Sequence, residues 1–241
     1  TLYMGSASGS GANVATYVNS VSGSGRFRYN SDEGITRFTA LSPTASGLYV
    51  VLRQNPTLTV TANNSSMVYG STLTPSTSSS VTGFINGDTL AQAVSTAASI
   101  AVGGTQSNTG YYTAGNHTLT PSAAASDLGY GFTYATGTLN VTPKSLTTTA
   151  TVAGGTKVYD GNTSASTQLS LTGVVSTDNV LVSSASSVYA DKNVGTGKSV
   201  TVSGLTLSGV DAANYSLAST SVGTTGNITK KNLTATYAAS N

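Results

Sequence analysis

The segment Pro56-Thr57-Leu58-Thr59-Val60-Thr61-Ala62 decides the fold class, and similar segments follow at Lys144-Ser145-Leu146-Thr147-Thr148-Thr149-Ala150 and Lys231-Asn232-Leu233-Thr234-Ala235-Thr236-Tyr237. In the first copy, Leu58, Val60 and Ala62 alternate with threonines, which is the period of a half-buried β-strand. The leucines of successive copies lie about 88 residues apart, a length that suffices for a domain with its own core. The chain is therefore predicted to be a tandem array of small β modules.

Further short strands are predicted between the copies. Leu139 and Val141 alternate with polar residues before the second copy, and Ile228 lies between polar residues before the third. Asn-Gly, Gly-Gly and Asp-Gly pairs separate the apolar segments, as turns do between strands. The predicted fold class is all-β (mainly β), and the sequence leaves β-grasp-like modules and immunoglobulin-like sandwiches open as alternatives. Other strand candidates are residues 169–172, 200–202 and 205–207.

One segment favours a helix instead. Residues 88–100 are rich in alanine, and Asp88 precedes them as a candidate N-cap residue. We expect a turn or two of helix there.

The repeat predicts four segments along the chain. Residues 56–143 and 144–229 form two complete modules, and residues 230–241 begin the next repeat. Residues 1–55 are a partial or preceding β segment with a Gly/Ser-rich start. Apolar residues in that segment that are candidates for strands packing on the first module are Phe27, Tyr29, Phe38 and residues 48–52.

Prolines mark the joints between the predicted segments. Pro56 and Pro143 stand directly before the first and second opening strands, where a proline stiffens the joint and stops the preceding strand from pairing further. The linkers are then only a few residues long. We expect the modules to be arranged as an elongated rod.

The composition limits the classes of function. Charged residues make up 7% of the 241 residues and the net charge is +2, against about 25% charged residues in an ordinary soluble domain. Serine, threonine, asparagine and glycine must therefore provide the polar surface. All arginines lie at or before Arg53 and all lysines at or after Lys144. No basic stripe with interleaved aromatics results, so nucleic acid is not an expected partner.

An enzyme is not expected. The eight acidic residues are spread along the chain, mostly beside glycine or asparagine, which is typical of turns. His117 is the single histidine, cysteine is absent, and no Gly-x-Ser-x-Gly motif surrounds a candidate nucleophile. Zinc ligands are lacking. Asp160 with Asn162, or Asp88 with Asn86, would be a thin supply of calcium ligands. No catalytic, metal-binding or cofactor-binding residue is predicted.

Lysines allow one alternative in the second module. An intramolecular isopeptide bond joins a lysine to an asparagine or aspartate beside a catalytic acid, and it can replace disulfides as a covalent cross-link. Solvated surface lysines are the preferred interpretation. The candidate groups are Lys144, Lys157, Lys192 and Lys198, with Asp160 and Asp191.

Aromatic residues gather in one part of the first module. Tyr111, Tyr112, Tyr130 and Tyr134, together with Phe132, form the densest aromatic group of the sequence. Flat apolar rings on a surface suit carbohydrate, so these tyrosines are the candidate ligand-facing residues. Packing in a core or between strands is the alternative that we favour.

Several motifs resemble known families. Met67-Val68-Tyr69-Gly70, Thr82-Gly83-Phe84-Ile85-Asn86-Gly87-Asp88 and Gly137-Thr138-Leu139-Asn140-Val141-Thr142 resemble the MBG-type modules of bacterial surface exoproteins. Lys157-Val158-Tyr159-Asp160-Gly161-Asn162-Thr163, Asn193-Val194-Gly195 and Ala213-Asn214-Tyr215-Ser216-Leu217 resemble the YDG-type module. We interpret the motif residues as structural, as parts of strand ends and turns; they are Tyr69, Gly70, Gly83, Phe84, Asp88, Tyr159, Asp160 and Gly161.

The first block of the chain adds to the resemblance. Ser24-Gly25-Arg26-Phe27-Arg28-Tyr29-Asn30-Ser31-Asp32 resembles the segment that precedes such modules in filamentous-haemagglutinin-like adhesins. The resemblance implies a large secreted or surface-attached bacterial protein, exported by two-partner secretion with a dedicated outer-membrane partner. It implies roles in cell adhesion and biofilm cohesion at the cell surface.

The expected function is that of a non-catalytic stalk segment, a monomer that acts as a spacer. The alternative is a module of the same adhesin that binds carbohydrate, either exopolysaccharide or a glycan of a host or neighbouring cell. Exposure of the tyrosines at 111, 112, 130 and 134 in one concave patch would favour the alternative.

Overall fold

The computed structural model describes residues 2–4, 16–17, 19–31, 49–72, 75 and 77–236. Some residues named above lie outside these ranges, so the structure gives no account of them: Asp32, Phe38, Leu48 and the end of the third copy from Tyr237.

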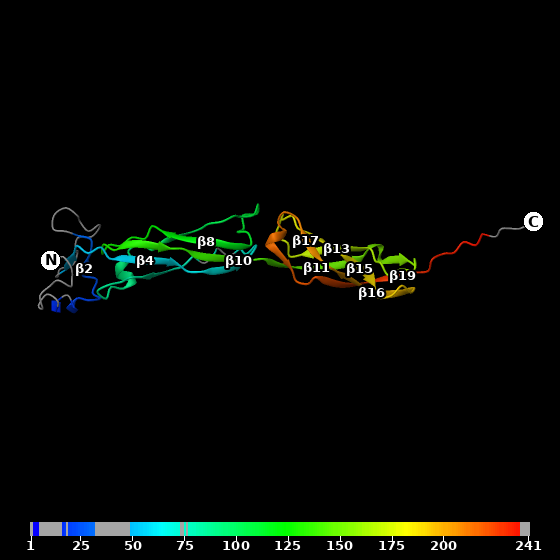
Figure 1. Ribbon diagram of the computed structural model, residues 1–241, viewed down its shortest axis with the longest axis horizontal. Coiled ribbons are helices and arrows are strands. Elements are labelled where there is room, and N and C mark those ends of the chain that lie inside the picture. The colour runs from blue at the N-terminus through cyan, green and yellow to red at the C-terminus, as the bar shows by residue number, and fades with distance from the viewer. Residues whose placement is uncertain are drawn as a thin grey trace, which may run out of the picture. The chain divides into compact units, whose positions relative to one another are not determined.

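The fold is all-β, as predicted (Figure 1). The described residues also include helical residues at 16–17 and 19–20, the one-turn helix α2 and the 3-10 turns η2 and η3. The elements are β1 (Leu2–Met4), β2 (Phe27–Arg28), β3 (Val50–Leu52), β4 (Thr57–Ala62), β5 (Ser65–Val68), β6 (Ser79–Thr82), α2 (Leu90–Ala93), β7 (Ser99–Val102), β8 (Gly115–Ser122), β9 (Gly131–Ala135), β10 (Gly137–Thr142), β11 (Lys144–Val152), η2 (Ala153–Gly155), β12 (Thr156–Val158), β13 (Thr167–Thr172), β14 (Leu181–Ser183), β15 (Ser186–Tyr189), β16 (Gly195–Ser203), β17 (Thr206–Ser208), η3 (Ala212–Asn214), β18 (Tyr215–Leu217) and β19 (Ser221–Thr229).

The chain divides into two compact units that do not follow the repeat boundaries strictly. Unit 1 comprises residues 1–67, 73–104 and 116–140, and unit 2 comprises residues 68–72, 105–115 and 141–241. Two short segments of the first repeat thus belong to the same compact unit as the second repeat.

In unit 1, the first opening strand is the centre of a three-stranded sheet. β4 pairs antiparallel with β6 and parallel with β9, in the order β6-β4-β9. Leu58, Val60 and Ala62 of β4 are at most 2% exposed, so the predicted alternation is confirmed. Most of a second sheet, β5-β10-β8-β7, also lies in this unit.

The N-terminal segment contributes directly to the core of unit 1. β2 and β3 pair in parallel in a small sheet with β1. Phe27, Tyr29, Val50 and Leu52 lie in one buried cluster with Leu58 of β4. These contacts bury apolar surface of both segments, and such burial stabilises each of them.

Unit 2 repeats this pairing. β11 pairs antiparallel with β13 and parallel with β18, in the order β13-β11-β18. A four-stranded sheet, β12-β19-β16-β15, lies in the same unit with the hairpin β14-β17. Val152 of the first sheet shares one core with Tyr189, Val200 and Ile228 of the second. Two sheets of unit 2 therefore pack around one core.

The predicted helix exists, but its cap was assigned to the wrong residue. α2 begins after Thr89, whose backbone N–H and hydroxyl both donate to Oε1 of Gln92, at 2.9 and 3.0 Å. Asp88 does not cap the helix, because its carboxyl group is buried and engaged elsewhere.

Candidate functional site

A buried carboxylate bonded to two tyrosines is the most distinctive polar site of unit 1. Asp88 is 5% exposed, and its Oδ2 accepts hydrogen bonds from the hydroxyls of Tyr29 at 2.8 Å and Tyr130 at 2.9 Å. The two rings meet edge to face, with centroids 4.7 Å apart, a favourable arrangement for aromatic pairs. We call Tyr29, Asp88 and Tyr130 the first carboxylate cluster.

The motif before Asp88 shapes the turn that places it. Gly83 has φ +101, and a Cβ there would lie 2.7 Å from the carbonyl oxygen of Thr57, so glycine fits best. Asn86 and Gly87 both have positive φ, and the Asn86 amide donates to the Tyr29 hydroxyl at 3.1 Å. The sequence Gly-Phe-Ile-Asn-Gly-Asp is therefore a turn that delivers one carboxyl group into the core.

Burial dominates the electrostatics of this cluster. It raises the pKa of Asp88 above its ordinary value, while the hydrogen bonds from both tyrosines and the charge of Arg28 act in the opposite direction. Burial also raises the pKa of Tyr29, and it raises that of Tyr130 to about 12. Arg28 is itself buried, with its guanidinium 5.1 Å from the ring centroid of Tyr49.

Unit 2 contains a second cluster of the same kind. Oδ2 of Asp178 accepts hydrogen bonds from the hydroxyls of Tyr69 at 2.7 Å and Tyr215 at 2.5 Å. The rings of these tyrosines meet edge to face at 5.3 Å, and Thr109 donates to Oδ1 of Asp178 at 3.3 Å. Burial is the main cause that raises the pKa values of Tyr69 and Tyr215. We call Tyr69, Asp178 and Tyr215 the second carboxylate cluster.

The two clusters occupy equivalent places in the repeat. Asp88 follows the positive-φ residue Gly83 by five positions, and Asp178 follows Gly173, with φ +102, by the same number. Tyr130 directly precedes β9, the parallel neighbour of β4, and Tyr215 begins β18, the parallel neighbour of β11. Sequence reasoning interpreted Asp178 only as a turn residue, although its spacing from Gly173 could have revealed it.

Tyrosine ionisation provides a test of both clusters. A phenol whose pKa is raised in the folded protein stabilises the fold fully below its ordinary pKa of about 10, and that contribution is lost as the pH rises above it. We expect Tyr29, Tyr69, Tyr130 and Tyr215 to stay protonated in the folded protein when the pH passes 10. Tyrosinate absorbance should therefore rise in two stages, the second coinciding with the loss of the β circular-dichroism signal. A single complete rise without unfolding would contradict the arrangement.

The predicted ligand-facing tyrosines are divided between the two compact units. Tyr111 and Tyr112 belong to unit 2, where both are half-buried, and Tyr130 and Tyr134 belong to unit 1. Tyr130 is buried in the first carboxylate cluster. Tyr134 is 41% exposed, stacks on Phe132 at 6.4 Å and accepts a hydrogen bond from the backbone N–H of Ala124.

The Tyr-Asp-Gly motif places its aspartate beside a lysine. Lys157 Nζ lies 2.9 Å from Oδ1 of Asp160 and donates to Oδ1 of Asn162 at 2.6 Å and to the carbonyl of Ser164 at 2.8 Å. Gly161 provides the positive φ of this turn. The Lys157 hydrogen bond lowers the pKa of Asp160, so this carboxyl group is ionised at neutral pH.

The surroundings of Lys157 oppose the isopeptide alternative. Formation of the bond from Lys157 Nζ to the Asn162 side-chain carbonyl carbon releases ammonia and needs a neighbouring acid to assist it. Here the neighbouring acid, Asp160, has a lowered pKa and a side chain that is 45% exposed to water. We expect the intact mass of the purified chain to equal the sequence mass, with no loss of ammonia. A loss of ammonia that disappears in a Lys157→Arg variant would contradict this prediction.

Other candidate chemistries find no support among the described residues. His117 is 4% exposed, and its Nδ1 lies 3.2 Å from the carbonyl oxygen of Gly103. No group of three His, Cys, Asp or Glu side chains that could hold a metal ion occurs in that part of the chain. The same residues contain no helix that is long and apolar enough to span a membrane.

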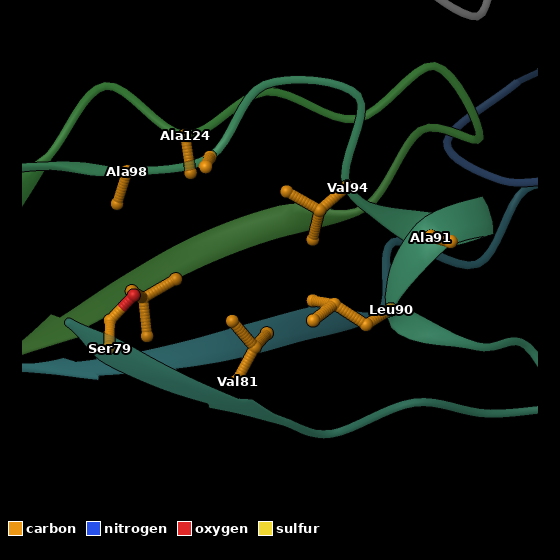
Figure 2. A pocket seen from close by; sticks show the side chains of 9 residues that line it. Ser79, Val81, Leu90, Ala91, Val94, Ala98 and Ala124 are labelled. Atoms are coloured by element: carbon orange, nitrogen blue, oxygen red, sulfur yellow. The ribbon is translucent and has the colours of Figure 1, made fainter.

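Unit 1 also contains a small apolar cavity (Figure 2). Its volume is about 230 Å³, and no charged side chain lines it. Leu90 and Val94 of the α2 region face Val81 of β6 across it in Figure 2. The remaining lining residues are Val60, Ser79, Ala91, Ala97, Ala98 and Ala124.

Comparison with known families matches both repeats. The family model described as MBG domain (YGX type) matches residues 58–140, and the model described as YDG domain matches residues 142–223. No curated protein and no solved structure matched the chain. An MBG-type domain and a YDG domain are thus present in tandem, as in a modular, adhesin-like surface protein.

Proposed function

We propose, from this tandem of an MBG-type and a YDG domain, that the chain is a non-catalytic stalk segment of a large bacterial adhesin of the filamentous-haemagglutinin kind. The parent protein is secreted or attached to the cell surface, is exported through a dedicated outer-membrane partner, and acts in cell adhesion and biofilm cohesion. The segment itself works as a spacer.

The second carboxylate cluster is the observation that carries the proposal. Tyr69 belongs to the residues matched by the MBG model, whereas Asp178 and Tyr215 belong to those matched by the YDG model. Their hydrogen bonds lie inside unit 2, which takes in residues 68–72 and 105–115 of the first repeat. A spacer needs successive domains that fold onto one another, and a shared carboxylate provides such a connection without a disulfide.

Small-angle X-ray scattering of the purified chain tests the spacer role. A compact globule of this length would have a radius of gyration of about 18 Å. An extended stalk should give a clearly larger value and a distance distribution with a long tail. A value near that of the globule would overturn the proposal.

Carbohydrate binding remains the alternative function, favoured by the exposed stack of Tyr134 on Phe132. A glycan-array screen separates the two functions, with Tyr134→Ala as the variant and circular dichroism as the control of folding. A passive spacer should bind no glycan. Specific binding that the variant loses would assign the adhesive site to Tyr134 and replace the spacer proposal.

A further inference from the structure

Three tyrosines occupy the same place in three successive β segments. Tyr29, Tyr69 and Tyr159 each follow a short strand, respectively β2, β5 and β12. These short strands are the neighbours of β3, β10 and β19, the last strand of each segment. Tyr69 and Tyr159 also make equivalent backbone hydrogen bonds. The N–H of Tyr69 donates to the carbonyl of Thr142, the last residue of β10, and the N–H of Tyr159 donates to that of Thr229, the last residue of β19, both at 2.9 Å.

Only two of these tyrosines have the carboxylate partner. Tyr29 is 0% exposed and Tyr69 is 1% exposed, and each donates its hydroxyl proton to an aspartate that comes later in the chain. Tyr159 is 36% exposed, and its hydroxyl makes no hydrogen bond to the residues that the structure describes. The ring therefore presents an apolar face and a free donor at the end of unit 2.

The opening segment of the third repeat also differs from its counterparts in burial. Leu58 and Leu146 are both 0% exposed, whereas their counterpart Leu233 is 91% exposed. Residues 231–236 form no strand in the structure. In the first complete repeat, Leu58 lies in a cluster with Leu128 and Tyr130 of its own repeat and with Phe27 and Tyr29 of the preceding segment. Tyr130 also donates to the aspartate that accepts from Tyr29.

We propose that Tyr159 is a docking site for a further β module of the same kind, whose opening strand is the segment around Leu233. The partner chemistry is specific: a carboxylate five residues after a positive-φ glycine, together with a tyrosine at the start of the strand parallel to the opening strand. That carboxylate accepts from the Tyr159 hydroxyl as Asp178 accepts from Tyr69. Asp160, beside Tyr159, is neutralised by Lys157, so it does not repel the incoming carboxylate. The inference rests on the proposed spacer function.

A tandem chain tests the docking site. It consists of residues 1–230 followed by a second copy of residues 144–241, so that the appended copy stands where the third repeat begins. The appended copy carries Tyr159→Phe, so that the nitrated peptide reports the Tyr159 of the first copy alone. Tyrosine nitration, located by peptide mass spectrometry, measures access to each ring. We expect Tyr159 to be nitrated at least about ten-fold more slowly in the tandem chain than in the chain of 241 residues, while Tyr134, also exposed, serves as an internal reference and keeps its rate.

Variants identify the partner group. Replacement of the appended copy's Asp178 by alanine should restore rapid nitration of Tyr159, whereas the same change in the first copy should expose Tyr69 instead. An unchanged rate at Tyr159 beside a folded appended copy would overturn the proposal, and so would failure of that copy to fold, because it is the occupant proposed. The scattering and glycan measurements do not involve Tyr159, so a failed docking site and a failed spacer can be told apart.

Discussion

Replacement of Asp88 by alanine is expected to lower the free energy of unfolding of unit 1 by about 2–4 kcal/mol. The hydroxyls of Tyr29 and Tyr130 would remain in the core without their acceptor. A hydrogen bond to a charged group is worth about 1.5–3 kcal/mol, and an unsatisfied buried donor costs its desolvation energy. Alanine cannot replace the carboxylate, and it also leaves a small cavity.

Urea denaturation followed by tyrosine fluorescence and hydrogen exchange measures this loss. Hydrogen exchange assigns the loss to unit 1, where peptides that contain β4 and β9 should exchange faster. Asp191→Ala is the matched control, because Asp191 forms an exposed pair with Lys198, and such pairs contribute about 0–1 kcal/mol. An Asp88→Ala protein as stable as the control variant would show that the first carboxylate cluster does not stabilise the fold.

The same carboxyl group gives the stability of unit 1 a pH dependence of known sign. Because burial raises the pKa of Asp88 in the folded state, the folded protein binds this proton more tightly than the unfolded chain does. The contribution of Asp88 to stability is therefore largest below its ordinary pKa, and it falls as the pH rises through the raised value. Asp88→Asn should remove this part of the pH dependence.

Replacement of Gly209 by alanine is expected to destabilise unit 2 by about 3 kcal/mol or more. Gly209 has φ +109, and a Cβ there would overlap the carbonyl oxygen of Asn179. The overlap involves backbone, which cannot move away as a flexible side chain can. Asn179 follows Asp178 directly, and its N–H donates to Oδ2 of Asp211 at 2.8 Å, so the displacement would also reach the second carboxylate cluster.

Gly110→Ala separates strain from overlap. Gly110 lies in the same unit with φ +82, but a Cβ there would meet no atom within 4 Å. The Gly110→Ala variant should therefore lose only the strain energy of a positive φ, about 1 kcal/mol, from its free energy of unfolding. Thermal unfolding followed by circular dichroism compares the two variants. Equal losses would mean that the contact at Gly209 relaxes without cost.

The sequence predicted the opening strand of the first module well, because the alternation of apolar and polar residues is a local property. The alternation in residues 57–62 fixes which side chains face the core, and β4 has that burial pattern. The N-cap residue of the helix was harder to predict, because Asp88 and Thr89 are both acceptable N-cap residues. The carboxyl group of Asp88 accepts hydrogen bonds from two tyrosine hydroxyls in the tertiary structure, so Thr89 caps the helix instead.

The grouping of the aromatic residues could not be predicted from the sequence. Tyr111 and Tyr130 are close enough in sequence to suggest one cluster, yet they belong to different compact units. Sequence distance does not report which strands pair, so a group of rings along the chain need not form a group in space.

The sequence by itself determined the all-β class, the repeat of about 88 residues and the turns that glycine and asparagine require, because backbone sterics and strand periodicity act over a few residues. The tertiary structure alone decided which tyrosine each aspartate meets. Tyr69 and Asp178 are 109 positions apart, and their hydrogen bond forms only when strand pairing and core packing have brought them together. A hydroxyl donor and a carboxylate acceptor are common side chains, so their pairing is specified by the fold around them and not by any local pattern.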